Sequence, residues 1–218
     1  GYFRNFGRTR RQGLELGLSA KPARGLTVGG NFMLLDATYR SAETLGGAGN
    51  SSNDQAQAGF PGTDGNIHIR PGDRIPMLPS QVLKLFADYE PNAQWRIGMD
   101  MLASSGARLR GNENGQHAPD GVYYTGPGQS AGYAVFNLGV DYKPRPGLKF
   151  FVQVSNLFDT RYTTGGQLAA NGFTDSGAYI ARGLPQNANG DYPVSRASLM
   201  SPGAPRAAWV GLRYTFGH

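Results

Sequence analysis

The sequence predicts an all-β fold, namely part of an antiparallel transmembrane β-barrel with about seven strands. Apolar side chains recur at every second position in seven separate segments, and the connections between these segments are alternately short and long. Glycine (33 residues) and proline (14 residues) are abundant and only 17% of residues are charged, yet aromatic residues reach 11%. Disordered chains are poor in aromatic residues, so the glycines and prolines are expected to punctuate strands.

Each predicted strand has one apolar face and one polar or small-residue face, as period-two alternation requires. The polar faces carry charges such as Asp88, Arg96, Asp141 and Lys149, and Gln12 and Glu15 are assigned to the polar face of the first strand. A charge on the apolar face at mid-membrane would cost about 2–4 kcal/mol. The predicted strands are Thr9–Ala20, Leu26–Tyr39, Gln81–Tyr89, Gln94–Met101, Gly132–Tyr142, Leu148–Phe158 and Arg206–Phe216.

The connections indicate a barrel rather than a soluble β-sandwich, which is the alternative architecture. Three are short, contain proline and are expected to be tight turns: Lys21–Gly25, Glu90–Ala93 and Lys143–Gly147. The other three are long, polar and expected to lack regular structure: Arg40–Ser80, Gly106–Ala131 and Thr163–Pro205. Outer-membrane barrels have short periplasmic turns and long extracellular loops. Tyr89, Trp95, Tyr142, Tyr214 and Phe216 would form the aromatic girdle near the short turns.

Seven spanning strands with two unpaired edges cannot close a barrel, because lipid offers no hydrogen-bond partner to an open edge. Residues 1–218 are therefore expected to be one portion of a barrel. No signal peptide and no initiator methionine are present, so either the chain is not exported or its N-terminus has been removed. The chain has no cysteine and no apolar run of the roughly 20 residues that a spanning helix needs.

The sequence shows no catalytic constellation and implies neither a cofactor nor a metal site. His68, His117 and His218 are isolated and lack metal-ligand spacing. The net charge of +6 comes from scattered basic residues, which argues against nucleic-acid binding.

The second long connection holds the candidate ligand-binding residues, namely Arg108, Arg110, His117, Tyr123 and Tyr124. Guanidinium groups and aromatic rings suit anionic, metal-chelating or aromatic ligands. The alternative is that His117 is a solvated loop residue, and that the two tyrosines belong to an upper aromatic belt or pack the loop.

Several strings resemble the barrel of TonB-dependent outer-membrane receptors. Asn156-Leu157-Phe158-Asp159, followed by Arg161-Tyr162, is similar to a signature of the family's penultimate strand. The other similar strings, in the same order over the chain, are Arg11–Leu16, Leu35–Tyr39, Ile75-Pro76, Gly203–Arg206 and Gly211–Phe216. The resemblance makes Asn156, Leu157, Phe158, Asp159 and Tyr162 a structural motif, and places Tyr214 and Phe216 in a C-terminal assembly strand. The chain ends Phe216-Gly217-His218, whereas the family usually ends on the aromatic residue.

The resemblance implies the last strands of a 22-stranded barrel in the outer membrane of a Gram-negative cell. It also implies energy-coupled import of a scarce ligand such as an iron–siderophore complex, with an N-terminal plug domain and the TonB complex as partners. Lipid bilayer and lipopolysaccharide would surround the strands. Two other interpretations compete with this one: an outer-membrane barrel that acts as an enzyme or adhesin through its long loops, and a soluble periplasmic binding module. Because the sequence shows no catalytic constellation, the chain is expected not to be an enzyme.

Overall fold

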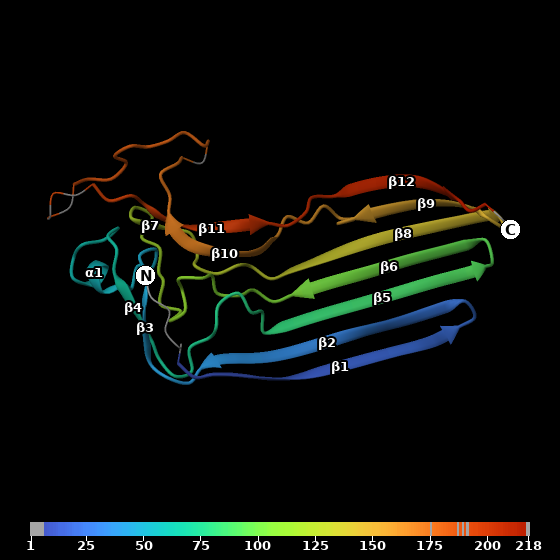
Figure 1. Cartoon of the computed structure of the whole chain (residues 1–218), viewed down its shortest axis with the longest axis horizontal. Coiled ribbons are helices and arrows are strands. Elements are labelled where there is room, and N and C mark those ends of the chain that lie inside the picture. Colours follow the sequence, from blue (N-terminus) through green and yellow to red (C-terminus); the bar gives the residue numbers. More distant parts are fainter. Residues whose placement is uncertain (1–6, 175, 187, 189, 191, 217–218) are drawn as a thin grey trace.

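The computed structural model describes residues 7–174, 176–186, 188, 190 and 192–216. It is an elongated, nearly all-β molecule in which one long sheet leads into a cluster of loops at one end (Figure 1). No helix in this described part of the chain is long and apolar enough to cross a membrane.

The long sheet is an antiparallel meander with seven strands in the order β1-β2-β5-β6-β8-β9-β12. The prediction of seven strands is therefore confirmed, and so is their antiparallel pairing. The strands are β1 (Thr9–Ala23), β2 (Leu26–Tyr39), β5 (Gln81–Asn92), β6 (Trp95–Ser104), β8 (Tyr133–Arg145), β9 (Leu148–Ser155) and β12 (Ala207–Tyr214).

The three short turns are tighter than predicted. Strands β1, β5 and β8 continue through Pro22, Pro91 and Pro144, which seemed to mark the turns, and each pairing shifts register close to its proline. A bulge accommodates proline because the missing N–H falls where the ladder is already interrupted. Chain reversal takes place over residues 24–25, 93–94 and 146–147, where Gly25 (φ 74°) and Gly147 (φ 77°) adopt the left-handed conformation.

The predicted sixth strand was too long. Strand β9 ends at Ser155 rather than at Phe158, because Asn156 takes a φ of 49° and leaves the extended conformation. A strand cannot continue through a left-handed residue, which turns the chain.

The long connections are not structureless, contrary to the prediction. Together they form a two-stranded sheet, a three-stranded sheet and a short helix. Most of the fully buried side chains, among them Ile67, Leu109 and Tyr124, lie in this part of the molecule, so the loops have a core of their own. The elements are β3 (Glu43–Gly46), α1 (Asp54–Gln57), β4 (Asn66–Ile69), β7 (Tyr124–Thr125), β10 (Thr163–Ala170) and β11 (Arg196–Pro202).

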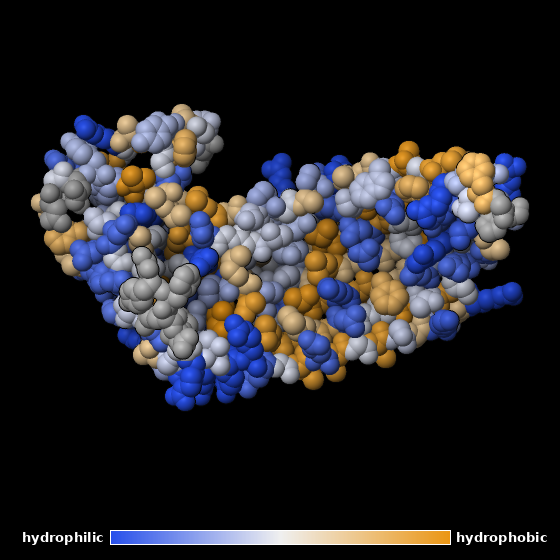
Figure 2. Space-filling model, in the orientation of Figure 1, coloured by the Kyte–Doolittle hydropathy of each residue, from blue (hydrophilic) through white to orange (hydrophobic). Residues whose placement is uncertain are grey.

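Strand register brings the predicted apolar positions onto one continuous face of the sheet, here called the apolar face. Across this face Leu14 pairs with Leu34, and Val140 pairs with Val152. Hydrophobic side chains are spread along the sheet in Figure 2. Gln12 was assigned to the wrong face: it pairs with Asp36 on the apolar face, because it lies an even number of residues from Leu14.

The opposite, polar face pairs several of its charged side chains across neighbouring strands. Arg96 Nη2 lies 2.8 Å from Asp88 Oδ1, and Lys149 Nζ lies 3.0 Å from Asp141 Oδ2. Asn137 Nδ2 donates to Asp100 at 2.7 Å. Each of these three contacts joins two neighbouring strands.

Candidate ligand-binding site

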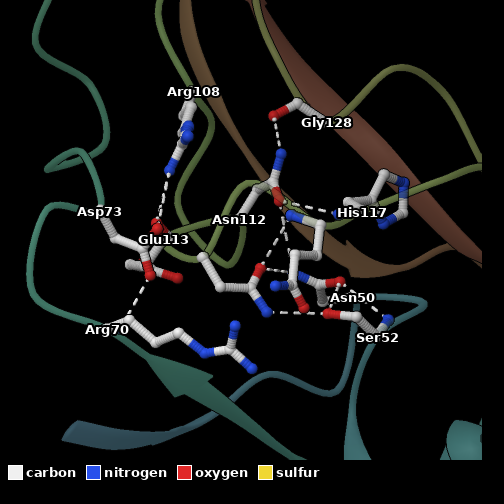
Figure 3. Close-up of polar contacts among 11 residues, drawn as sticks. Asn50, Ser52, Arg70, Asp73, Arg108, Asn112, Glu113, His117 and Gly128 are labelled. Atoms are coloured by element: carbon white, nitrogen blue, oxygen red, sulfur yellow. Dashed lines mark hydrogen bonds and ion pairs between the residues drawn. The ribbon is translucent and has the colours of Figure 1, made fainter. Parts of the chain in front are cut away.

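The loops of the first two long connections are joined by a buried polar cluster, here called the loop junction and made of Asn50, Ser52, Asn112, Asn114 and His117 (Figure 3). Asn50 is completely buried. Its Nδ2 donates to the Gly111 carbonyl at 2.8 Å and to Asn114 Oδ1 at 3.1 Å, and its Oδ1 accepts from Ser52 N at 2.9 Å.

The other amides of the loop junction are satisfied in the same way. Asn112 Nδ2 donates to the Gly128 carbonyl at 3.0 Å, while Asn112 Oδ1 accepts from His117 N at 3.1 Å. Asn114 Nδ2 donates to Ser52 Oγ at 2.8 Å. Buried polar groups stabilise a structure only when they are paired, so this cluster specifies one arrangement of the two loops.

His117 uses both ring nitrogens in the loop junction. Nδ1 accepts from Ser51 N at 3.2 Å, and Nε2 lies 3.2 Å from the Gly126 carbonyl. These partners fit the neutral ring with its proton on Nε2. Burial lowers the pKa of His117 from its ordinary value of 6.5, against the opposing influence of the Gly126 carbonyl and Asp120.

Acidification is expected to loosen the loop junction. A base whose pKa is lowered on folding binds fewer protons folded than unfolded, so its stabilising contribution is complete above pH 6.5 and is lost as pH falls. Protonation at Nδ1 would also set two donors against each other at Ser51. The protection of the Ser51 and Ala118 amides against hydrogen exchange, corrected for the intrinsic exchange rate at each pH, should decrease as pH falls below 6.5, by at most about tenfold per pH unit for one proton. His117→Gln should abolish this pH dependence; a variant with the wild-type profile would show that another group titrates.

Three of the predicted ligand-binding side chains are engaged within the loops. Arg108 Nη1 donates to the Glu113 carbonyl at 2.8 Å and lies 3.9 Å from Asp73 Oδ1 (Figure 3). Tyr124 is 2% exposed, and its hydroxyl accepts from Asn53 Nδ2 and Gly62 N. His117 is the third. Their expected contact with a ligand stays a prediction.

Arg110 and Tyr123 are placed differently. Tyr123 is half-buried beside β11, where its carbonyl accepts from Arg196 N at 2.7 Å. Arg110 is exposed and lines a cavity of about 910 Å³ where the polar side of β1 and β2 meets the loops. The cavity is also lined by Arg11, Tyr39, Glu113 and Gln167.

This cavity can hold an anionic ligand, because Arg11 and Arg110 line it and Glu113 is the one acidic residue among the described residues of its lining. The Glu113 carboxylate already accepts from Gly111 N at 3.1 Å. Sequence reasoning missed Arg11, Tyr39 and Gln167 as cavity residues. The position of Arg11 on the polar face at the loop end of its strand was the one available signal.

The two remaining histidines do not add a metal centre to this site. His68 Nδ1 lies 3.2 Å from Thr44 Oγ1, and His218 lies outside the described residues. Among the residues described, no group of three or more His, Cys, Asp or Glu side chains is arranged to hold a metal ion.

The motif that follows β9 joins three strands. Asn156 is 2% exposed; its Nδ2 donates to the carbonyls of Thr160 (2.9 Å) and Ala204 (3.0 Å), and its Oδ1 accepts from Thr160 N (2.8 Å). Phe158 packs edge-on against Phe136 with ring centroids 5.2 Å apart. Asp159 Oδ1 accepts from Arg206 N at 3.2 Å.

The rings of this region extend these contacts. Tyr162 and Tyr133 have centroids 4.5 Å apart, and Leu157 N donates to the Phe136 carbonyl at 2.7 Å. In the last strand, Tyr214 pairs with Leu148 and its ring lies 4.7 Å from that of Phe216. The role of Tyr214 and Phe216 in assembly stays a prediction.

The long antiparallel meander, its two different faces and the large structured loops at one end together define a β-barrel sheet of the outer-membrane type. A family model described as TonB dependent receptor-like, beta-barrel matches residues 1–157. The chain belongs to this family.

Solved structures share the fold. The siderophore receptor PiuA from Acinetobacter baumannii superposes with a TM-score of 0.59 at 14% identity, over 96% of this chain and 22% of that one. The ferric-catecholate import receptor Fiu from E. coli K12 gives a TM-score of 0.56 at 20% identity, over 96% and 21%. The ferric yersiniabactin uptake receptor FyuA from Yersinia pestis gives 0.58 at 13%, over 97% and 24%. The chain thus spans about a fifth to a quarter of the length of these structures.

Proposed function

We propose that this chain is part of an outer-membrane receptor that imports a scarce ligand, an iron–siderophore complex in particular, by energy coupling. Membership of the TonB-dependent receptor family carries the proposal. The position of the cavity supports it, because Arg11 and Arg110 face the space where the polar side of the sheet meets the loops. A ligand arriving from the loop side would meet these guanidinium groups on its way to the barrel interior.

We further propose that residues 1–218 form the C-terminal part of the barrel. Its two edge strands, β1 and β12, each pair on one side within the described sheet, and an open edge is not tolerated in lipid. Earlier strands of the same receptor would complete the barrel, and an N-terminal plug domain would fill the lumen and contact the TonB complex. The apolar face would contact the bilayer and lipopolysaccharide in the outer membrane of a Gram-negative cell. No catalytic role is proposed.

Removing the charge of Arg110 is expected to weaken ligand binding without changing the loops. Arg110→Ala should lower the affinity for an anionic ferric tris-catecholate complex about tenfold, which is roughly 1.4 kcal/mol. Arg110→Lys should retain most of the affinity, and a neutral ferric hydroxamate should be affected less. Arg108→Ala is expected to act through the loop structure instead, since Arg108 holds Glu113 and Asp73.

The measurement is titration of each complex onto whole cells that express the full-length receptor. Each variant also carries Gln116→Cys, and labelling this cysteine on whole cells measures the amount of receptor at the surface, so that the levels can be matched. Gln116 is suitable because it is an exposed loop residue. Unchanged affinity of Arg110→Ala at low salt would remove this cavity from the ligand site. Binding to all cells regardless of receptor level would contradict the proposed function itself.

A further inference from the structure

Four arginines gather at the loop-side ends of β1 and β2, on the side of the apolar face. They are Arg8, Arg10, Arg40 and Arg74, here called the arginine patch. Figure 2 shows hydrophilic side chains collected at this rim, where Figure 1 places the loop-side ends of β1 and β2. A role for the patch at the membrane rests on the proposed function in one respect, which is that the apolar face contacts lipid.

Strand register sets the face of the patch. Arg10 pairs with Thr38, and Thr38 forms an antiparallel bridge with Arg74, so these three side chains lie in one row on one side of the sheet. Arg40 N donates to the Arg8 carbonyl at 2.7 Å, which continues the ladder by one step beyond the Thr9–Tyr39 pair. Arg10 and Leu14 lie on the same face about 14 Å apart along the strand, at about 3.4 Å per residue. The patch therefore borders the apolar band.

The charges of the patch are mostly uncompensated. Arg10 Nη2 lies 3.4 Å from Asp36 Oδ2, and both side chains are more than 40% exposed. The guanidinium groups of Arg8, Arg40 and Arg74 are exposed and have no hydrogen bond or ion pair to another described residue. On the polar face of the same sheet, Arg96 and Lys149 are each paired with a carboxylate. What distinguishes the patch is that three such unpaired arginines lie together at one rim of the sheet.

A hydroxyl group in the same row also lacks a partner. Thr38 is 7% exposed, and its Oγ1 is buried without a hydrogen-bond partner among the described residues. It lies in the row between Arg10 and Arg74. A buried hydroxyl without a partner costs free energy, and a ligand oxygen held by the two neighbouring arginines could pair with it after a side-chain shift.

We propose that the arginine patch binds the phosphate groups of a lipid headgroup in the outer leaflet, that is, the phosphorylated glucosamine headgroup of lipopolysaccharide. Arginine binds phosphate through two parallel N–H donors, and such charge-assisted bonds are stronger than neutral ones. The acyl chains of the same lipid would lie on the adjoining apolar band, which continues from Leu14 and Leu34. The patch is separate from the ligand cavity, because Arg11 and Tyr39 of that cavity lie on the other face of the sheet.

The test compares two triple variants of the full-length receptor purified in detergent. Arg8→Gln/Arg40→Gln/Arg74→Gln removes three charges from the patch and leaves the Arg10–Asp36 pair intact. Lys21→Gln/Arg24→Gln/Arg145→Gln removes three exposed charges at the opposite, short-turn end of the sheet and is the matched control. Diphosphorylated lipid A, dephosphorylated lipid A and inorganic phosphate are titrated against each protein, with bound lipid measured by native mass spectrometry.

The patch variant should bind diphosphorylated lipid A at least tenfold more weakly than wild type, and the control variant should stay within about twofold. Replacing Arg8, Arg40 and Arg74 by lysine instead of glutamine should retain much of the binding. Correct folding of every variant is checked by heat-modifiable gel mobility. Equal binding by the patch and control variants, or equal binding of phosphorylated and dephosphorylated lipid, would overturn the proposal. Displacement of the lipid by inorganic phosphate at similar concentration would also overturn it, in favour of a small-anion site. Import of the ferric complex is assayed in cells that express wild type and the same variants, so a receptor that binds lipid A but imports nothing would contradict the proposed function alone.

Discussion

Val152→Arg is expected to prevent most of the full-length receptor from reaching its folded state, whereas Gln153→Arg is expected to be tolerated. Val152 lies in the middle of β9 on the apolar face, between Val140 of β8 and Val210 of β12. An arginine on the lipid face costs about 2–4 kcal/mol at the bilayer midplane. This is a large part of the roughly 5–15 kcal/mol by which a folded protein is stable.

Gln153 provides a matched comparison one residue away on the polar face. Its Oε1 accepts from Trp209 Nε1 at 2.8 Å, so Gln153→Arg loses one exposed hydrogen bond, worth about 1 kcal/mol, but puts no charge into lipid. Gln153→Glu keeps the acceptor and should be closer to wild type. The folded fraction is measured in outer-membrane preparations by heat-modifiable gel mobility. Similar losses for Val152→Arg and Gln153→Arg would mean that the apolar face does not face lipid.

The strands and their faces were predictable because alternation is a local property. A strand whose two faces meet different surroundings shows the difference at every second residue, and this pattern located both ends of β2. Prolines misled the placement of the turns, because proline marks either a turn or a bulge and only pairing with the neighbouring strand distinguishes them. The end of β9 was missed for a similar reason, since the left-handed conformation of Asn156 depends on its contacts with Thr160 and Ala204.

The loop core was not predictable, because its contacts join residues that are far apart in the sequence. Asn50 bonds to Asn114 across 64 positions, and Arg196 bonds to the Gly62 carbonyl across 134. Isolated asparagines in polar loops give no periodic signal, so they looked like solvated residues. The same long-range contacts explain why the residues of the candidate site were only partly predictable. Arg110 lines the cavity, whereas Arg108 and Tyr124 are occupied by contacts that only the folded loops create.

The Asn156 motif is the case in which the family resemblance indicated a structural role and the geometry now supplies a physical reason. Asn156 takes a φ of 49° at the point where β9 ends. Its side chain makes three hydrogen bonds: two with Thr160 close the turn, and one to the Ala204 carbonyl connects it to the segment before β12. Asparagine is among the few residues that tolerate the left-handed conformation while offering both a donor and an acceptor.

Asn156→Ala is therefore expected to destabilise the full-length receptor by about 3–5 kcal/mol. Each lost hydrogen bond costs about 1 kcal/mol, buried carbonyls left unpaired cost more, and alanine in the left-handed region adds about 1 kcal/mol. Asn156→Gly relieves the backbone cost but not the lost bonds, so it should recover only about 1 kcal/mol. Asn156→Asp keeps the acceptor for Thr160 N but directs a carboxylate at two carbonyls, and should be as damaging as alanine.

The measurement is urea unfolding of the receptor in liposomes, followed by tryptophan fluorescence. Asn171→Ala serves as the control, because the side chain of Asn171 accepts one local hydrogen bond, from Phe173 N at 3.1 Å, and that variant should stay within about 1 kcal/mol of wild type. If glycine restores full stability at position 156, backbone strain rather than the three hydrogen bonds governs the motif. If alanine itself is neutral there, the motif does not hold β9 to β12, and a functional role for Asn156 becomes the better explanation.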